Sequence, residues 1–273
     1  LQLMKAESPG PDVEKLVPKS KSTARILYGI YVIMTIVQIL LLRCGGLSFF
    51  ESTTLSFGTA GTGGFAIVNS SIADYSLYTQ IIIGVFMMLF GINFNFYFLL
   101  FCGKLKAAFR NVEVKSYIGI MATSIILIAL NIRHIFGSFF EALHQSAFQV
   151  SSVMTTTGYA TTDFDKWPVF SRTVMLIVMC VGACAGSTGG GFKVSRIVIL
   201  AKSARRELKR LAHPRSVSVI TMDGKRISDE VVTGTNVFFF IYVVVFVVSL
   251  LIVSTDGKDM VTNISGVIAT LNN

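Results

Sequence analysis

The sequence predicts an all-α integral membrane protein built from repeated units, each consisting of a helix, a pore loop and a second helix. Composition is the first reason: 52% of the 273 residues are hydrophobic and only 14% are charged, whereas soluble domains carry about 25% charged residues. The second reason is that the apolar residues gather in stretches long enough to cross a bilayer. The third is a polar motif that recurs between these stretches.

Five apolar stretches meet or approach the length of about 20 residues that a membrane helix needs. They cover residues 24–44, 76–102, 116–133, 169–200 and 231–254. Two segments between them are rich in Ser, Thr and Gly and too polar to span, and the last residues of the chain begin a third segment of this kind.

The distribution of Lys and Arg orients these stretches. Five, four and eight of these residues lie in the segments 1–25, 103–115 and 201–230, respectively, and the segments between the spans on the other side carry at most one each. Short loops rich in Lys and Arg remain cytoplasmic, so the polar segments are predicted to lie on the outer side. Topology therefore accounts for the net charge of +9, and no nucleic-acid partner is expected.

The two polar segments are copies of one motif. Each contains the tetrapeptide SFFE, at 48–51 and 138–141, followed by a Ser/Thr-rich helical stretch. Each then ends in a similar turn, TGGF at 62–65 and TTGY at 156–159. The alignment sets glycine on glycine and aromatic on aromatic at a spacing of about 94 residues, so the unit is predicted to repeat.

A short helix followed by an extended, glycine-containing strand is typical of a re-entrant pore loop. Backbone at membrane depth is tolerated only inside protein or along a watery cavity, and its carbonyls can replace the hydration shell of a cation. The carboxyl end of the short helix also favours a cation. A selectivity filter is therefore predicted at Thr62, Gly63, Gly64, Phe65, Thr156, Thr157, Gly158 and Tyr159, with the ion held at Thr62, Gly63, Gly64, Thr156, Thr157 and Gly158.

Other polar residues lie near these motifs. Glu51 and Glu141 stand at the amino ends of the short helices, where an acid suits the helix dipole, so a structural role is favoured over ion binding. Asn93 and Asn95 interrupt the apolar stretch 76–102. They either line the inner cavity or hydrogen-bond a neighbouring unit, which is the commoner role of an isolated Asn in a membrane helix.

The stretch 169–200 is too long for one untilted span and contains five glycines within GACAGSTGGG, at 182–191. Each glycine costs a helix about 1 kcal/mol relative to alanine, so two helical halves joined by an irregular loop are predicted. That loop requires a polar cavity, and the cavity beneath the filter is the obvious one. GSTGGGFK also looks superficially like a phosphate-binding P-loop, but Phe192 separates the last glycine from Lys193, and the preceding residues form a membrane helix rather than a strand.

Several of these motifs together resemble the Trk/Ktr/HKT superfamily of potassium-transport proteins, and most closely its bacterial Trk-type membrane subunit. They are FGTAGTGGF (57–65), SSVMTTTGY (151–159), GACAGSTGGGFKVSR (182–196) and AHPRSVSV (212–219). The resemblance covers essentially the whole chain. It implies a fused architecture similar to a K⁺ channel, in which four units of one polypeptide surround a single pore.

The resemblance carries further expectations. It implies K⁺ as the transported substrate, the bacterial inner membrane as the location, a homodimer, and a cytoplasmic nucleotide-binding regulatory subunit of the RCK/TrkA type. No cluster of acid, base and nucleophile indicates catalysis, so neither enzymatic activity nor a bound cofactor is expected.

In the family, the glycine-rich element forms an intramembrane loop below the filter that obstructs permeation. Carried over to this sequence, the gate is predicted at Gly182, Gly186, Ser187, Thr188, Gly189, Gly190, Gly191, Lys193 and Arg196. For the two cations the sequence leaves two roles open: an electrostatic barrier to K⁺, or snorkelling toward the cytoplasm. A structural or anion-pairing role is favoured for Arg196.

The predicted organisation follows the repeat. It comprises a cytoplasmic linker (1–23), a second unit (24–115), a third unit with the broken helix (116–200), a basic cytoplasmic loop (201–230) and the start of a fourth unit (231–273). The chain is therefore expected to be a piece of a longer protein. The alternative is a broken-helix secondary transporter of another small ion, but the polar segments all lie on one side in the same orientation, which favours a pore ringed by units.

Overall fold

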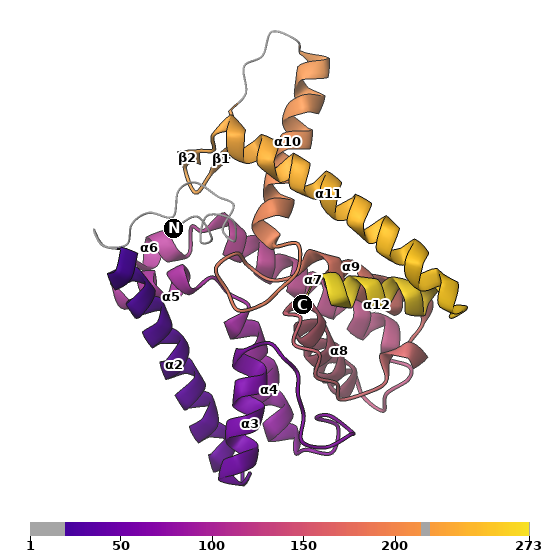
Figure 1. Cartoon of the computed structure of the whole chain (residues 1–273). Coiled ribbons are helices and arrows are strands. Elements are labelled where there is room, and N and C mark those ends of the chain that lie inside the picture. The colour runs from indigo at the N-terminus through magenta and orange to yellow at the C-terminus, as the bar shows by residue number, and fades with distance from the viewer. Residues whose placement is uncertain (1–19, 214–218, 273) are drawn as a thin grey trace.

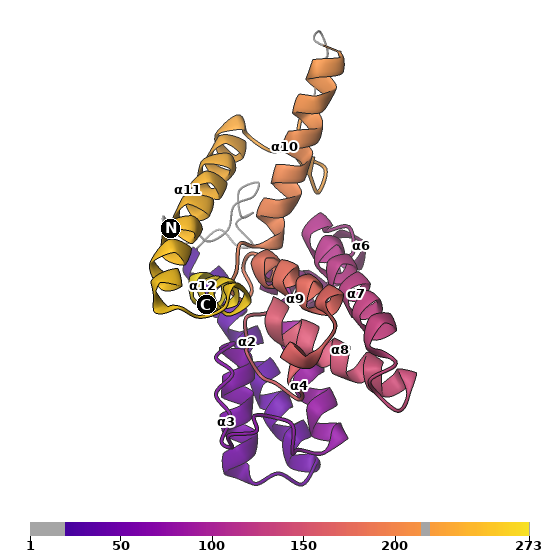
Figure 2. The ribbon, with the colours of Figure 1, turned by 90° about the vertical axis from the view of Figure 1, so that its right-hand side faces the viewer.

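The computed structural model describes residues 20–213 and 219–272. Most of the predicted linker 1–23 lies outside these residues, as do 214–218 of the predicted basic loop. The described part is mostly helical, with one short two-stranded hairpin (Figure 1). Its first helices form one bundle, and two long helices nearer the C-terminus extend from that bundle in both views (Figures 1 and 2).

The first repeat supplies a membrane-length helix, a short polar helix and an apolar return segment. The helices are α2 (Ser20–Cys44), α3 (Phe49–Ala60), α4 (Leu77–Phe90), α5 (Phe94–Phe101) and α6 (Leu105–Ala108). Ser48 begins α3 with a capping box: its side chain accepts a hydrogen bond from the backbone of Glu51, whose carboxylate accepts one from the backbone of Ser48. Such reciprocal bonds satisfy two free N–H groups and fix the start of the helix.

Hydropathy predicts one apolar span over residues 76–102, but the structure does not have a single straight helix there. The stretch divides into α4 and α5, which are bent by 90° relative to each other. Asn93 caps α5, since its side chain accepts a hydrogen bond from the N–H of Asn95 at 2.9 Å. Gly91 ends α4 where a larger residue would not fit, because a methyl group there would lie 2.3 Å from the Tyr117 hydroxyl. Tertiary packing and an asparagine cap thus override the continuous apolar pattern.

The second repeat follows the same order. Its elements are α7 (Val112–Ile132), α8 (Phe139–Met154), the 3₁₀ turn η1 (Phe164–Lys166), α9 (Val169–Val181) and α10 (Val194–Ala212). The side chain of Asn111 caps α7, so this helix starts four residues before the predicted stretch 116–133. The long stretch 169–200 breaks where its glycines predict, between α9 and α10.

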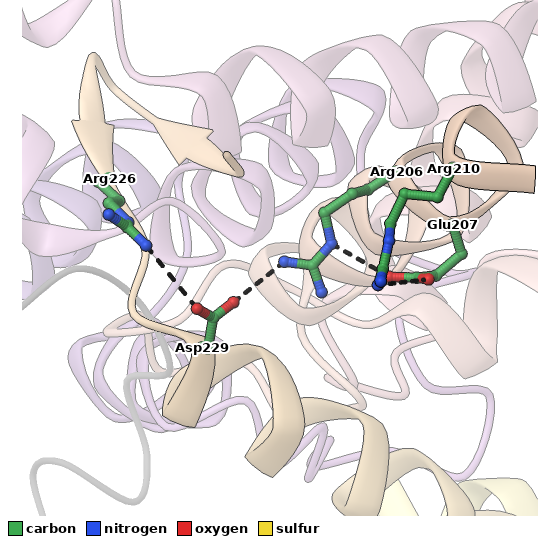
Figure 3. Close-up of polar contacts among 5 residues, drawn as sticks. All are labelled: Arg206, Glu207, Arg210, Arg226 and Asp229. Carbon is green, nitrogen blue, oxygen red and sulfur yellow. Dashed lines mark hydrogen bonds and ion pairs between the residues drawn. The ribbon is translucent and has the colours of Figure 1, made fainter. Parts of the chain in front are cut away.

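The remaining elements are the strands β1 (Thr221–Met222) and β2 (Lys225–Arg226), which pair antiparallel, and then α11 (Asp229–Val253), the turn η2 (Ser254–Asp256) and α12 (Met260–Asn272). Asp229 at the start of α11 lies between two arginines (Figure 3): its carboxylate oxygens are 3.1 Å from Arg206 of α10 and 3.8 Å from Arg226 of β2. These exposed ion pairs join α10, the hairpin and α11 at the end that extends from the bundle.

By length and composition, three helices of the described residues can cross a membrane: Ala24–Cys44, Val112–Ile132 and Asp229–Asp256. The bent pair α4–α5 adds a fourth candidate, and α9 is a shorter apolar helix. The largest buried cluster lies between α7, α8 and α9 and includes Tyr117, Met154 and Trp167. This packing holds the polar end of α8 inside the protein.

Candidate functional site

The two threonine–glycine strands, residues 62–65 and 156–159, emerge from α3 and α8 with the same hydrogen bonds. In the first strand the N–H groups of Gly63 and Gly64 donate to the Gly58 carbonyl, at 2.9 and 3.2 Å. In the second, the N–H groups of Thr157 and Gly158 donate to the Ser152 carbonyl, at 2.9 and 3.4 Å. The pattern recurs at the spacing that the sequence motif predicts.

The backbone angles of the two strands also match. Thr62 and Gly64 have φ of +50° and +64°, and Thr156 and Gly158 have φ of +58° and +86°. Gly63 and Thr157, which lie between the members of each pair, do not have positive φ. Alternating the sign of φ turns successive carbonyls toward one side, unlike an ordinary strand. For threonine this left-handed conformation is strained by roughly 1–2 kcal/mol, and strain of this kind is typical of functional sites.

The two strands touch each other. A methyl group added at Gly64 would lie 2.0 Å from the carbonyl oxygen of Thr157 and 3.1 Å from the carbonyl carbon of Gly158. Only glycine allows the first strand to approach the second so closely, since any Cβ would overlap the neighbouring backbone.

The aromatic residues that end the two strands differ in environment, although the motif pairs them. Tyr159 is 1% exposed, and its hydroxyl donates to the carbonyls of Leu55 at 3.1 Å and Phe65 at 3.4 Å. It therefore ties the second strand to α3 and to the end of the first strand. Phe65 is 78% exposed and makes no corresponding contact from its side chain in the described residues.

The glycine loop, residues 182–193, joins α9 to α10 and closes on itself. Ala183 donates to the Gly190 carbonyl at 3.2 Å, and Lys193 donates to the Val181 carbonyl at 3.1 Å. A methyl group on Gly191 would lie 2.4 Å from the Cα of Gly182, and one on Gly182 would lie 2.6 Å from the Cα of Gly191. The crossing of the two ends of the loop thus requires glycine on both sides.

The glycine loop lies directly against the start of both threonine–glycine strands and against the end of α12. The Thr62 hydroxyl donates to the Thr188 carbonyl at 3.1 Å, and the Gly190 N–H donates to the Thr156 hydroxyl at 2.8 Å. The Gly191 N–H donates to the Asn272 carbonyl at 2.8 Å. The carboxyl-terminal ends of three short helices from different parts of the sequence therefore meet on one loop.

The remaining predicted gate residues occupy the loop and its exit. The Ser187 hydroxyl donates to the Cys184 carbonyl at 2.6 Å, while Gly186 is exposed. A methyl group on Gly189 would lie 2.5 Å from the Cβ of Ala183, so this residue also packs tightly. The Lys193 ammonium donates to the carbonyl of Gly189, so this cation lies within the loop.

Arg196 lies in the first turn of α10 and is only 8% exposed. Its Nη1 donates to the Phe192 carbonyl at 3.0 Å. Its guanidinium carbon lies 4.1 Å from the centre of the Phe238 ring of α11, within the range of a cation–π interaction. These contacts support a structural role, in which Arg196 joins the end of the glycine loop to α11.

Sequence reasoning missed Glu113, which lies in the first turn of α7 and is 3% exposed. Its Oε1 accepts a hydrogen bond from the N–H of Ala185, in the glycine loop, at 2.6 Å. Its Oε2 accepts one from Asn93 Nδ2 at 3.4 Å. A single acid in a first helical turn is ordinary, so no signal in the sequence distinguishes this carboxylate.

This arrangement of apolar spanning helices around re-entrant polar helices, strained strands and a buried glycine loop defines a membrane protein of the pore-loop class. The model of the family described as "TrkH: Cation transport protein" matches residues 1–273. The chain therefore belongs to the TrkH family of cation transport proteins.

Characterised relatives show the same relationship. The chain is 36% identical to the "Trk system potassium uptake protein TrkH" of Salmonella typhimurium and of Escherichia coli K12, over 278 residues that include 100% of this chain and 58% of each relative. The structure of the potassium transporter TrkH from Vibrio parahaemolyticus matches with a TM-score of 0.88 and 34% identity, covering 98% of this chain and 59% of that one. The chain thus spans somewhat more than half the length of these relatives.

Proposed function

We propose that this chain forms part of a pore for potassium uptake across the bacterial inner membrane. The proposed filter consists of the carbonyls of Thr62, Gly63, Gly64, Thr156, Thr157 and Gly158, flanked by Phe65 and Tyr159. The relatives named as potassium uptake proteins support this substrate. Within this proposal, residues 24–115 and 116–200 are two units around the pore, and 231–273 begins another.

The observation that carries the proposal is the meeting of three short helices on the glycine loop. The ends of α3, α8 and α12 reach it through Thr62, Thr156 and Asn272. The carboxyl end of a helix carries a partial negative charge of about half an elementary charge, so three such ends at one place favour a cation there. Backbone carbonyls turned toward one side can then replace water around a dehydrated K⁺ ion.

The glycine loop is proposed as the gate. It lies against the first residue of both threonine–glycine strands, so an ion that leaves the filter on that side meets the loop. The proposed gate residues are Gly182, Gly186, Ser187, Thr188, Gly189, Gly190, Gly191, Lys193 and Arg196. Lys193, whose ammonium lies in the loop, adds a positive charge that opposes cation passage while the loop remains in place.

The proposed assembly is a homodimer with a cytoplasmic nucleotide-binding regulatory subunit of the RCK/TrkA type. The end of α10 offers a basic surface for such a partner. Arg206 and Arg210 lie there around Glu207 (Figure 3), with side chains that are 21%, 60% and 50% exposed, respectively. The positive charges at the end of α10 can bind either an acidic protein surface or anionic lipid.

The test is cation uptake in cells that lack potassium transport, using the full-length protein in which this chain occurs. Gly158→Ser places a hydroxymethyl group in open space beside the proposed ion position, since nothing lies within 4 Å of a Cβ there. Gly46→Ser is the matched control, because Gly46 also has positive φ and open surroundings but lies between α2 and α3.

The proposal expects wild-type K⁺ uptake, weakened K⁺ selectivity over Na⁺ in Gly158→Ser, and wild-type selectivity in Gly46→Ser. Absence of K⁺ uptake by the wild-type protein contradicts the proposed substrate. Equal selectivity in both variants contradicts the placement of the filter.

A further inference from the structure

The glycine loop is bound to the bend between α4 and α5 as well as to the threonine–glycine strands. Phe94 donates its N–H to the Gly186 carbonyl at 3.0 Å, and Cys184 donates to the Gly91 carbonyl at 3.1 Å. The Thr188 N–H donates to the Phe90 carbonyl at 3.3 Å. Residues 184–188 of the loop are thus paired by backbone hydrogen bonds with residues 90–94, which include the end of α4, the 90° bend and the start of α5.

Glu113 completes this contact from the other side. Its Oε1 accepts the N–H of Ala185 at 2.6 Å, in the middle of the paired stretch. Its Oε2 accepts Nδ2 of Asn93 at 3.4 Å, and Oδ1 of Asn93 accepts the N–H of Asn95 at 2.9 Å. The chain of bonds therefore runs from the loop through Glu113 and Asn93 to the start of α5.

A buried carboxyl group needs hydrogen bonds to offset its desolvation. The bonds from Ala185 and Asn93 form together only while the loop and the bend are both in place. Withdrawing the loop removes the Ala185 donor, and the loss of a hydrogen bond to a buried acceptor is costly. The carboxylate therefore favours the closed loop more strongly than a backbone contact alone.

We propose that Glu113 is a positioning residue that latches the glycine loop against the α4–α5 bend, with Asn93 as its supporting partner. The inference rests on the proposed role of the loop as a gate. According to this proposal, α7 belongs to one unit and the α4–α5 bend to the preceding unit. Together they determine how readily the glycine loop leaves its position beneath the filter.

The hydrogen-bond pattern can be tested by exchanging the carboxyl group of Glu113 and the amide group of Asn93. In Glu113→Gln, the amide oxygen can still accept from Ala185, but the amide nitrogen then faces the nitrogen of Asn93, donor against donor. Turning Asn93 over would lose its bond to Asn95. The double variant Asn93→Asp/Glu113→Gln restores the pattern, since an aspartate at 93 accepts both from Asn95 and from the new glutamine.

Cys184, a buried thiol in the loop itself, is a reporter that does not depend on ion transport. With the other cysteines of the full-length protein replaced, the rate at which a soluble maleimide modifies Cys184 measures how often the loop leaves its site. We expect Glu113→Gln to raise this rate about tenfold, which corresponds to about 1.4 kcal/mol. The double variant should return it to the wild-type rate.

Uptake of K⁺ at saturating external concentration provides the second readout. Glu113→Gln should increase the flux per protein molecule with unchanged K⁺/Na⁺ selectivity, and the double variant should restore the wild-type flux. Glu141→Gln, which neutralises an exposed carboxylate in the first turn of α8, is the control and should change neither measurement. If Glu113→Gln fails to reach the membrane, Asn93→Ala removes the supporting bond and should raise the Cys184 rate to a smaller extent.

The proposal is overturned if Glu113→Gln, or Asn93→Ala in its place, leaves the Cys184 rate unchanged. It is also overturned if the double variant reacts as fast as Glu113→Gln, because the hydrogen-bond pattern would then not hold the loop. A restored Cys184 rate in a protein that takes up no K⁺ would instead support the latch and contradict the proposed function.

Discussion

Replacing Gly64 by alanine tests the contact between the two threonine–glycine strands. Gly64 has φ of +64°, and its added methyl group would lie 2.0 Å from the Thr157 carbonyl oxygen and 2.9 Å from the carbonyl carbon. The obstacle is the backbone of the other strand and not the flexible end of a side chain. The substitution therefore moves one of the carbonyls that the proposed filter uses.

The size of the effect follows from two costs. A left-handed conformation costs a non-glycine residue roughly 1–2 kcal/mol. Relieving the overlap to 3.0 Å requires a movement of about 1 Å, and overpacking of this kind typically costs about 1–3 kcal/mol. A carbonyl displaced in this way no longer replaces a hydration-shell oxygen of the ion. We expect the K⁺/Na⁺ ratio of uptake to fall at least about tenfold, which is about 1.4 kcal/mol.

Two variants separate the costs. Gly158→Ala has positive φ in the second strand but open space around its Cβ, and Gly46→Ala has the same strain and open space outside the site. Measured by K⁺ and Na⁺ uptake in transport-deficient cells, the loss of selectivity should be greatest for Gly64→Ala and absent for Gly46→Ala. Equal selectivity in Gly64→Ala and Gly46→Ala would refute the argument from strand contact.

Three further outcomes are expected. Tyr159→Phe loses hydroxyl bonds at 3.1 and 3.4 Å and should lower the free energy of unfolding, measured by chemical denaturation, by about 0.5–1.5 kcal/mol. Removing the exposed aromatic ring of Phe65 in the first strand should not lower it. Gly91→Ala, whose methyl group would lie 2.3 Å from the Tyr117 hydroxyl, should lower the free energy of unfolding by about 1–3 kcal/mol in the same measurement. Gly119→Ala, at an exposed position in a helix, is the control and should be neutral or stabilising. Equal losses of stability in the two variants would contradict the packing argument. Hydrogen bonds from the side chain and backbone of the α3 cap lower the pKa of Glu51. Its stabilising contribution should be complete above the ordinary value of 4.5 and be lost as the pH falls through the lowered pKa, a dependence that Glu51→Gln should remove from the pH profile of the unfolding midpoint.

The sequence could predict the parts of the fold that depend on local pattern. Residue spacing alone aligns Gly64 with Gly158, and five glycines in ten residues are incompatible with a regular helix, so the break before α10 was predictable. The 90° bend at Gly91 was not, because Asn93 and Asn95 interrupt the apolar stretch without indicating a change of direction, and hydropathy does not distinguish a straight span from a bent one. A side chain that packs against Gly91 at the bend is that of Tyr117, which is distant in sequence.

The site shows the same division. The motif gives Phe65 and Tyr159 equivalent positions, yet one is 78% exposed and the other 1%. Tyr159 bonds to Leu55 of α3, 104 residues earlier, and residue spacing in the motif does not reveal that contact. Glu113 has no motif at all. Its contact with Ala185 spans 72 residues, and only the tertiary structure brings this carboxylate beneath the loop.

The contacts of the glycine loop also impose an order on biosynthesis. The loop bonds to Thr62, which is 126 residues before Thr188, and to Asn272, near the end of the described residues. Ribosomes add roughly 5–20 residues per second, so several seconds pass between the synthesis of Gly191 and that of its acceptor. The earlier helices can enter the bilayer in that interval while the glycine loop still lacks one of its three supports, and the last-made short helix completes its hydrogen bonding.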